Sequence, residues 1–258
     1  MSRKRPRSFL SLLRASMLTL AAAGTLAPQT RASADIGFSS APSRSQLDRL
    51  TQELGASIAA PALAPAEGLG AFRVETLVSG TATDISSEAS FWRIASRGGS
   101  FSSFVVLPRA TIRLGLPASI DLSASYAKLP GSNIEAAGGA AKWTFIRGST
   151  VLPAFALRLA HDRLRGVDQM DLKATSLDLS VSKGLLFFTP YAGVGRLWLS
   201  SDVHDISSAP GFRLSDSTAE NRVFVGGRFS AAWFNTLVEA ERTGPVESYS
   251  VKLAVAFP

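Results

Sequence analysis

The final stretch of the chain, Tyr249-Ser-Val-Lys-Leu-Ala-Val-Ala-Phe257, alternates between two kinds of side chain. Successive side chains of a β-strand point to opposite faces, so the larger apolar residues share one face and the small or charged residues share the other. The apolar face consists of Tyr249, Val251, Leu253, Val255 and Phe257. An apolar row that ends on aromatic residues, set against a polar row, is typical of a strand with lipid on one side and a polar interior on the other.

Similar runs recur along most of the chain. Ten candidate strands lie at residues 69–79, 103–116, 119–129, 134–147, 151–163, 171–183, 187–201, 220–233, 234–243 and 246–257. Most exceed the roughly five or six residues usual in soluble strands and match the length that crosses a membrane at a tilt. A soluble β-sandwich also alternates apolar and polar residues. Strand length and aromatic placement together favour an all-β fold, a transmembrane antiparallel β-barrel of about ten strands.

The connections between these strands alternate between tight and long. Tight joints are expected near Leu116-Pro117-Ala118, Gly148-Ser149-Thr150, Lys183-Gly184-Leu185 and Trp233-Phe234, and longer polar ones at 80–102, 130–133, 164–170 and 202–219. Short periplasmic turns and longer external loops are the usual asymmetry of an outer-membrane barrel. We therefore expect a bacterial outer-membrane protein with both termini in the periplasm. The segment 80–102 could contain a further hairpin, so eight or twelve strands remain alternatives.

The first 68 residues differ from the rest. Residues 1–34 have a basic start, a short apolar stretch and the small-residue site Ala32-Ser33-Ala34, which predicts a secretory signal peptide cleaved before Asp35. Residues 35–68 are expected to form a short amphipathic helix, with Leu47, Leu50, Leu54 and Ile58 at helical spacing, followed by an Ala/Pro linker. This segment could plug the barrel, cover its periplasmic mouth or lie against its rim. Residues 69–258 would be the barrel domain.

Composition limits the function. Six of the 27 Lys and Arg residues and none of the acidic residues precede Asp35, so the mature chain carries 21 basic and 20 acidic residues. A nucleic-acid partner is therefore not expected. The chain has no cysteine and two histidines, which argues against disulfides and against a His- or Cys-based metal site. We expect no cofactor and no bound metal.

The inward faces of the predicted strands carry charged residues. Lumen-lining candidates are Arg109, Arg113, Asp121, Arg158, Asp178, Arg222, Arg228 and Glu239, and the same reasoning adds Arg73, Glu75, Lys142, Arg196, Glu241 and Lys252. Basic side chains outnumber acidic ones, which would bias an open pore toward anions. Alternatively, the charges pair across a filled interior, as is common in small barrels. The strand 187–201 does not divide clearly into an apolar face and a polar face.

Several pieces resemble outer-membrane β-barrel proteins of Gram-negative bacteria, in a loose group without known function. They are Leu69-Gly-Ala-Phe72, Arg113-Leu-Gly-Leu-Pro-Ala-Ser-Ile-Asp121 and Thr189-Pro-Tyr-Ala-Gly-Val-Gly195. The resemblance implies outer-membrane lipid as surroundings and the barrel-assembly machinery as a partner of the C-terminal strand. The assembly signal of such proteins normally ends on the aromatic residue, whereas here Pro258 follows Phe257.

Three functions follow as hypotheses. The leading one is a narrow passive pore or carrier for a small or apolar solute. The second is a non-conducting structural or surface-interaction barrel whose loops contact an unknown partner. The third rests on Asp202-Val-His204, which resembles the Asp–His pair of the omptin outer-membrane proteases, although the facing acidic pair of that family has no counterpart here. We therefore predict no catalytic residues and no enzymatic activity.

Overall fold

The computed structural model describes residues 34–231 and 233–257, which belong to one compact unit, Ala32–Pro258. The predicted signal peptide, apart from Ala34, and Pro258 lie outside the described residues. Within the described ranges, neither helix has the length and apolar character needed to span a bilayer.

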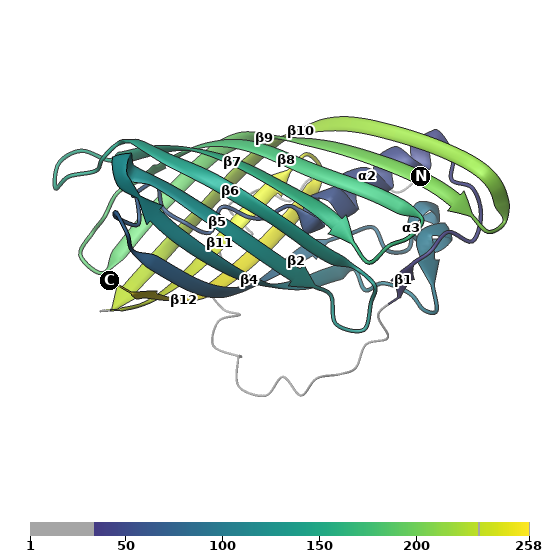
Figure 1. The fold of residues 1–258 in the computed structure, drawn as a ribbon, viewed down its shortest axis with the longest axis horizontal. Coiled ribbons are helices and arrows are strands. Elements are labelled where there is room, and N and C mark those ends of the chain that lie inside the picture. The colour runs from purple at the N-terminus through teal and green to yellow at the C-terminus, as the bar shows by residue number, and fades with distance from the viewer. Residues whose placement is uncertain (1–33, 232, 258) are drawn as a thin grey trace, which may run out of the picture. The chain divides into compact units, whose positions relative to one another are not determined.

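Ten antiparallel strands close into a barrel, which confirms the predicted fold class (Figure 1). The strands are β2 (Val74–Asp84), β4 (Phe104–Leu116), β5 (Ile120–Lys128), β6 (Glu135–Ile146), β7 (Ala154–Arg165), β8 (Met170–Ser182), β9 (Phe188–Ile206), β10 (Ala209–Ala231), β11 (Phe234–Thr243) and β12 (Val246–Phe257). The barrel is closed by pairing of β12 with β2, in which Phe257 lies opposite Val74. The segment Tyr249–Phe257 therefore belongs to the strand that closes the barrel.

Two predicted boundaries are wrong. The first strand begins at Val74, five residues later than expected, because Gly70 and Phe72 adopt positive φ and turn the chain into the sheet. The predicted loop 202–219 is instead the distal part of one long hairpin, β9 and β10, joined by a two-residue turn. Alternation continues through Leu199, Ser201 and Val203, so these strands extend beyond their neighbours.

The long 85–103 connection holds a short helix, α3 (Ser90–Ala95), and the strand β3 (Ser96–Arg97). β3 pairs with β1 (Asp35–Ile36), so the start of the described chain is attached to this connection. We call this end of the barrel the loop end, and the opposite end, with the tight joints and Phe257, the turn end.

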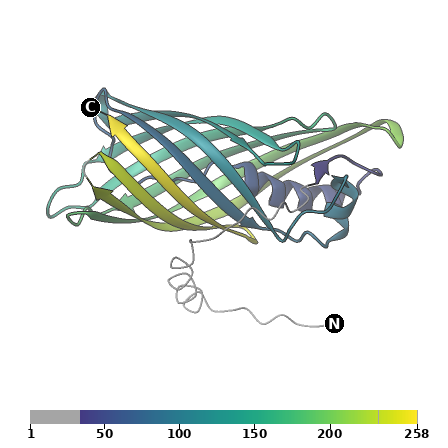
Figure 2. The same ribbon diagram turned by 90° about the horizontal axis from the view of Figure 1, so that it is seen from below.

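The helix α2 (Arg44–Ile58) lies inside the loop-end half of the barrel (Figures 1 and 2). Its start follows from the sequence, because Ser43 and Gln46 form a reciprocal capping box that binds the first free amides. The helix contacts seven strands, β2, β4, β7, β8, β9, β10 and β12. Residues 59–69 continue through the turn-end half before the chain enters β2. The N-terminal segment therefore runs along the length of the barrel interior.

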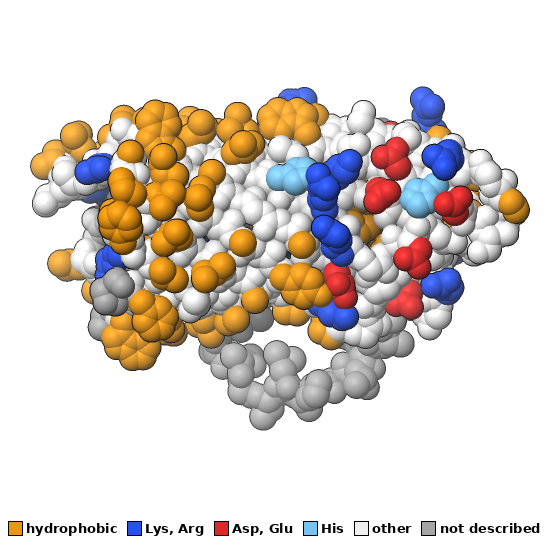
Figure 3. Space-filling model, in the orientation of Figure 1, with side chains coloured by type: hydrophobic (Ala, Val, Ile, Leu, Met, Phe, Trp, Pro, Cys, Tyr) orange, Lys and Arg blue, Asp and Glu red, His pale blue; other side chains and the backbone are white. Residues whose placement is uncertain are grey.

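The strands change their chemistry halfway along the barrel. On β8 the inward residues are apolar from Met170 to Ala174 and polar from Ser176 to Ser182. The outward residues change in the opposite sense, from Asp171 and Lys173 to Leu177, Leu179 and Val181. Figure 3 shows the result, hydrophobic side chains over the turn-end half and charged side chains over the loop-end half. The turn-end half thus has a lipid-facing exterior and a polar interior, whereas the loop-end half is built like a soluble protein.

The predicted periplasmic location of both termini is not confirmed. Asp35 pairs with Arg97 at the loop end, whereas Phe257 lies at the turn end. The even number of strands would return the chain to its starting side, but residues 34–70 cross the interior first. Asp35 and Phe257 therefore lie at opposite ends of the barrel.

The apolar belt predicts a depth-dependent cost for an introduced charge. Val194 on β9 is 57% exposed within the belt, and Ser200 lies on the same face toward the loop end. We expect Val194→Arg to reduce the free energy of unfolding in lipid vesicles by about 2–4 kcal/mol, the usual cost of a basic residue at the bilayer midplane. Ser200→Arg should leave it nearly unchanged. Urea titrations followed by the gel shift of unheated protein measure both; equal costs would contradict a lipid-facing belt.

Candidate functional site in the barrel interior

The loop-end half of the interior is an apolar core built around α2. Leu47, Leu50, Leu54 and Ile58 of the helix are at most 1% exposed and pack with inward residues of the surrounding strands. On the other side of the helix, a Cβ built on Gly55 would lie 2.6 Å from Leu199 on β9, so the helix backbone approaches the wall closely. The contact that fixes this approach is a 2.6 Å hydrogen bond between the hydroxyls of Thr51 and Ser201.

Below the helix, arginines from the wall bind the carbonyl groups of the N-terminal segment. Arg109 donates to the Ile58 carbonyl at the helix C-terminus at 2.6 Å, where a cation also opposes the helix dipole. Arg158 and Arg222 both donate to the Ala60 carbonyl, at 3.1 and 3.3 Å. The segment thus provides backbone acceptors for cations that line the interior.

Carboxylates of the wall bind amide groups of the same segment. Asp162 accepts from the Ala60 amide at 2.9 Å and pairs with Arg109 at 3.0 Å. Glu239 accepts from the Leu63 amide at 3.0 Å and from the Tyr191 hydroxyl at 2.6 Å. Because donors and acceptors of the linker both find partners on the wall, the linker occupies a defined register.

Two lysines hold the linker nearer the turn end. Lys252 donates to the Leu63 carbonyl at 3.2 Å and pairs with Glu75 at 3.0 Å. Lys142 donates to the carbonyls of Pro65 and Glu67, at 3.0 and 2.6 Å. Contacts between wall and linker therefore extend from the helix C-terminus to the turn-end mouth.

All eight predicted lumen-lining residues point into the barrel. Five of them bind the backbone of the N-terminal segment. Arg109, Arg158 and Arg222 donate to its carbonyls. Asp121 accepts from the Leu69 amide, and Glu239 accepts from the Leu63 amide. A sixth, Arg228, pairs with Glu67 of that segment at 2.9 Å. The remaining two bind wall residues, Asp178 with Arg158 and Arg113 with Glu75.

Sequence reasoning misplaced two residues and missed two others. Arg73 is exposed at the turn end, just before β2, and does not line the lumen. Arg196 points outward, because β9 keeps Gly193 and Gly195 inward, where a Cβ would collide with Phe224 and Asp178 respectively. Asp162 and Tyr191 are inward and central to the network. Continuing the alternation from Arg158 through Ala160 would have placed Asp162 inward.

The interior network binds the protein's own chain along its length. Opposite charges at 2.6–3.0 Å satisfy one another, as in the Arg222–Glu241 and Arg158–Asp178 pairs. Such pairs resist separation because each partner would be left as an uncompensated buried charge. The chemistry of this site is therefore retention of a peptide segment.

Asp202 and His204 lie apart from this interior, on the outward face of β9 near the loop end. Asp202 accepts from the Ser215 hydroxyl at 2.5 Å, and His204 contacts Asp205 at 3.1 Å and Asp171 at 3.4 Å. The described residues contain no cluster of three or more His, Asp or Glu side chains arranged to hold a metal ion. The absence of enzymatic activity stays a prediction.

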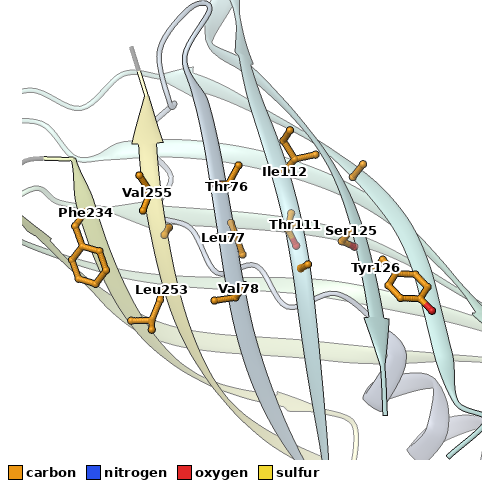
Figure 4. Close-up of a pocket in the computed structure, with 13 residues that line it drawn as sticks. Thr76, Leu77, Val78, Thr111, Ile112, Ser125, Tyr126, Phe234, Leu253 and Val255 are labelled. Carbon is orange, nitrogen blue, oxygen red and sulfur yellow. The ribbon is translucent and has the colours of Figure 1, made fainter. Parts of the chain in front are cut away.

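An open hollow lies outside the barrel, on the apolar belt over β12, β2, β4 and β5 (Figure 4). It is an open depression of about 710 Å³ between Phe234 at one side and Tyr126 at the other. The depression forms because outward positions here hold small residues, among them Thr76, Ala110 and Ala124.

Comparisons with known proteins find distant structural likenesses. No family model matches the chain, and no curated protein matches it. Among solved structures, the N-terminal barrel domain of Pseudomonas aeruginosa OprF is 12% identical, with a TM-score of 0.34 over 73% of this chain and 99% of that one. The KdgM porin with oligogalacturonate is 8% identical, with a TM-score of 0.38 over 71% and 99%. Ail of Yersinia pestis, bound to a heparin analogue, is 10% identical, with a TM-score of 0.33 over 73% and 100%.

Removing one interior cation should destabilise the fold strongly. Arg222 is 1% exposed and joins Glu241, Asp178 and the linker. We expect Arg222→Ala to lower the free energy of unfolding by about 3–5 kcal/mol, because both carboxylates lose a buried partner. Arg196→Ala, outward on the neighbouring strand, should cost within about 0.5 kcal/mol. Guanidinium titrations of the folded proteins in detergent compare the two, and similar losses would refute the interior network.

Proposed function

We propose that the protein is an outer-membrane barrel sealed by its own N-terminal segment, and that it works as a non-conducting structural or surface-interaction barrel. The observation that carries this proposal is the continuous binding of residues 58–69 by wall side chains, from Arg109 near the helix to Asp121 near the turn end. A solute would have to displace this segment to pass.

The architecture of the loop end supports an interaction role. Strands β9 and β10 extend beyond their neighbours, and β1, β3 and α3 cover the end of the barrel beside α2. Trp92 of α3 is fully buried, and its indole donates to Glu53 of α2 at 2.6 Å. This packing gives the loop end a fixed surface, which suits recognition of a partner better than passage of a solute.

A narrow passive pore or carrier, the leading hypothesis from the sequence, requires the N-terminal segment to move. The chain has no cysteine, so a disulfide can be introduced to hold the segment in place. Thr51 and Ser201 are suitable positions because their hydroxyl oxygens are 2.6 Å apart across the helix–wall contact. The pair Thr51→Cys and Ser201→Cys would fix α2 to β9 under oxidising conditions.

Planar-bilayer recordings decide between the two functions. We expect the wild-type protein to be electrically silent, the cysteine pair to be silent whether oxidised or reduced, and deletion of residues 35–66 to produce ion current, because the deletion removes the segment that fills the interior. The single Thr51→Cys variant is the matched control. The sealed barrel would be refuted if the wild type conducts and the current of the cysteine-pair variant disappears on oxidation and returns on reduction. That result would establish a mobile plug.

A further inference from the structure

A group of basic side chains lies on the outer surface where the apolar belt ends. On β7 the outward residues run from Leu157 and Leu159 through His161 to Arg163 and Arg165, all exposed. Lys173 on β8 lies directly opposite Arg163. Figure 3 shows Lys and Arg side chains in a row beside the edge of the hydrophobic half. We call Arg163, Arg165 and Lys173 the basic patch.

The basic patch is only partly compensated by its own chain: Glu135 lies directly opposite Arg165, and Arg163 donates to His161 Nε2 at 3.1 Å. Like charges directly opposite on neighbouring strands destabilise a sheet, and Arg163 and Lys173 form such a pair. Among the described residues, no acidic side chain forms an ion pair with any member of the patch. Glu135 forms its ion pair with Lys128 at 2.7 Å, and Asp171, on the same face of β8 as Lys173, lies 3.4 Å from His204. An anion from outside the chain would relieve this repulsion.

Basic residues at the turn end behave differently. Lys183 donates to the carbonyls of Ser149 and Thr150, at 3.0 and 2.8 Å, and Arg147 donates to the Ser119 hydroxyl at 2.7 Å. These cations are held by their own chain. Lys173, directly opposite Arg163, has no comparable acceptor among the described residues.

The apolar depression described above adjoins the basic patch. Tyr126, at its loop-end side, is followed across the sheet by Ala137 and then Arg163. Two strand spacings separate Tyr126 from Arg163, roughly 10 Å. A molecule with an anionic head and a long apolar tail fits this arrangement, and membranes provide such molecules.

We propose that this outer surface binds a phosphorylated glycolipid of the leaflet around the loop end, with phosphate on the basic patch and an acyl chain in the depression. The proposal rests on the membrane location in the proposed function. Guanidinium and ammonium groups are the usual protein partners of phosphate, and arginine binds it through paired N–H donors. The position of the patch beside the belt places these donors at headgroup depth.

Native mass spectrometry of the full-length barrel in detergent, titrated with bisphosphorylated lipid A, tests the proposal. Dephosphorylated lipid A and inorganic phosphate are the comparison ligands. We expect the phosphorylated lipid to bind more tightly than either. Replacing Arg163, Arg165 and Lys173 by Gln should weaken it about 100-fold, since each basic residue near an anionic surface contributes roughly fivefold. Lys173→Gln alone should cost roughly fivefold.

A matched triple variant removes Arg73, Arg147 and Lys183 from the turn end, with the same loss of charge. It should bind the lipid as wild type does. Filling the depression with Ala110→Leu and Ala124→Leu should weaken binding, whereas Ala192→Leu, on the outward face of β9, should not. The proposal would be overturned if phosphorylated and dephosphorylated lipid bind equally, or if inorganic phosphate binds as tightly as the lipid. It would also be overturned if the patch or depression variants bind the lipid unchanged, or if the turn-end control loses as much affinity as the patch variant.

The gel shift of unheated protein and the bilayer recording accompany each variant. A folded, silent patch variant that keeps full lipid affinity would refute the lipid site while leaving the sealed barrel intact. Conversely, a conducting wild type that loses lipid affinity in the patch variant would refute the sealed barrel and retain the lipid site.

Discussion

The structure depends on the need to pair charges inside a narrow barrel. A ten-stranded wall brings Arg109, Arg158 and Arg222 into a space where each unpaired charge would cost several kcal/mol. Wall carboxylates meet part of this need, and the carbonyls and amides of residues 58–69 meet much of the rest. The linker is suited to this role because Pro61 and Pro65 have no N–H and cannot continue the helix, which leaves the other backbone groups free to bind the wall.

A second constraint comes from the two solvents around the same strands. Where lipid surrounds the barrel, apolar residues must face outward and the interior must be polar or filled; where water surrounds it, the order reverses. β8 meets both demands by changing from Met170 and Leu172 inward to Leu177 and Leu179 outward without losing its period of two. The helix α2 lies where the interior is apolar, and the linker where it is polar. Each part of the N-terminal segment therefore matches the zone of the wall that surrounds it.

Much of this could be predicted from local patterns. Period-two alternation predicted the ten strands and the inward direction of the eight lumen candidates, and the helical spacing of Leu47, Leu50, Leu54 and Ile58 predicted the helix that is α2. The polar distal part of β9 and β10 was mistaken for a loop because it follows the soluble-protein pattern, with Asp202 and His204 outward. Arg196 was misplaced because Gly193 and Gly195, the inward residues that precede it, carry no side chain that would mark their face as polar or apolar. The path of residues 59–69 depends on contacts between residues about 50 to 190 positions apart, such as Lys252 with Leu63, which no local pattern contains.

The energetics of the N-terminal segment bear on whether the barrel opens by itself. Leu47, Leu50, Leu54 and Ile58 are fully buried, and burial of such side chains contributes about 1.5–3 kcal/mol each, or roughly 6–12 kcal/mol together. Release of the segment would regain backbone entropy of about 1–2 kcal/mol per residue, which opposes this contribution. The linker bonds to charged groups add about 1.5–3 kcal/mol each in favour of the bound segment. A transport role would therefore require a partner that binds an open state far more tightly than the closed one.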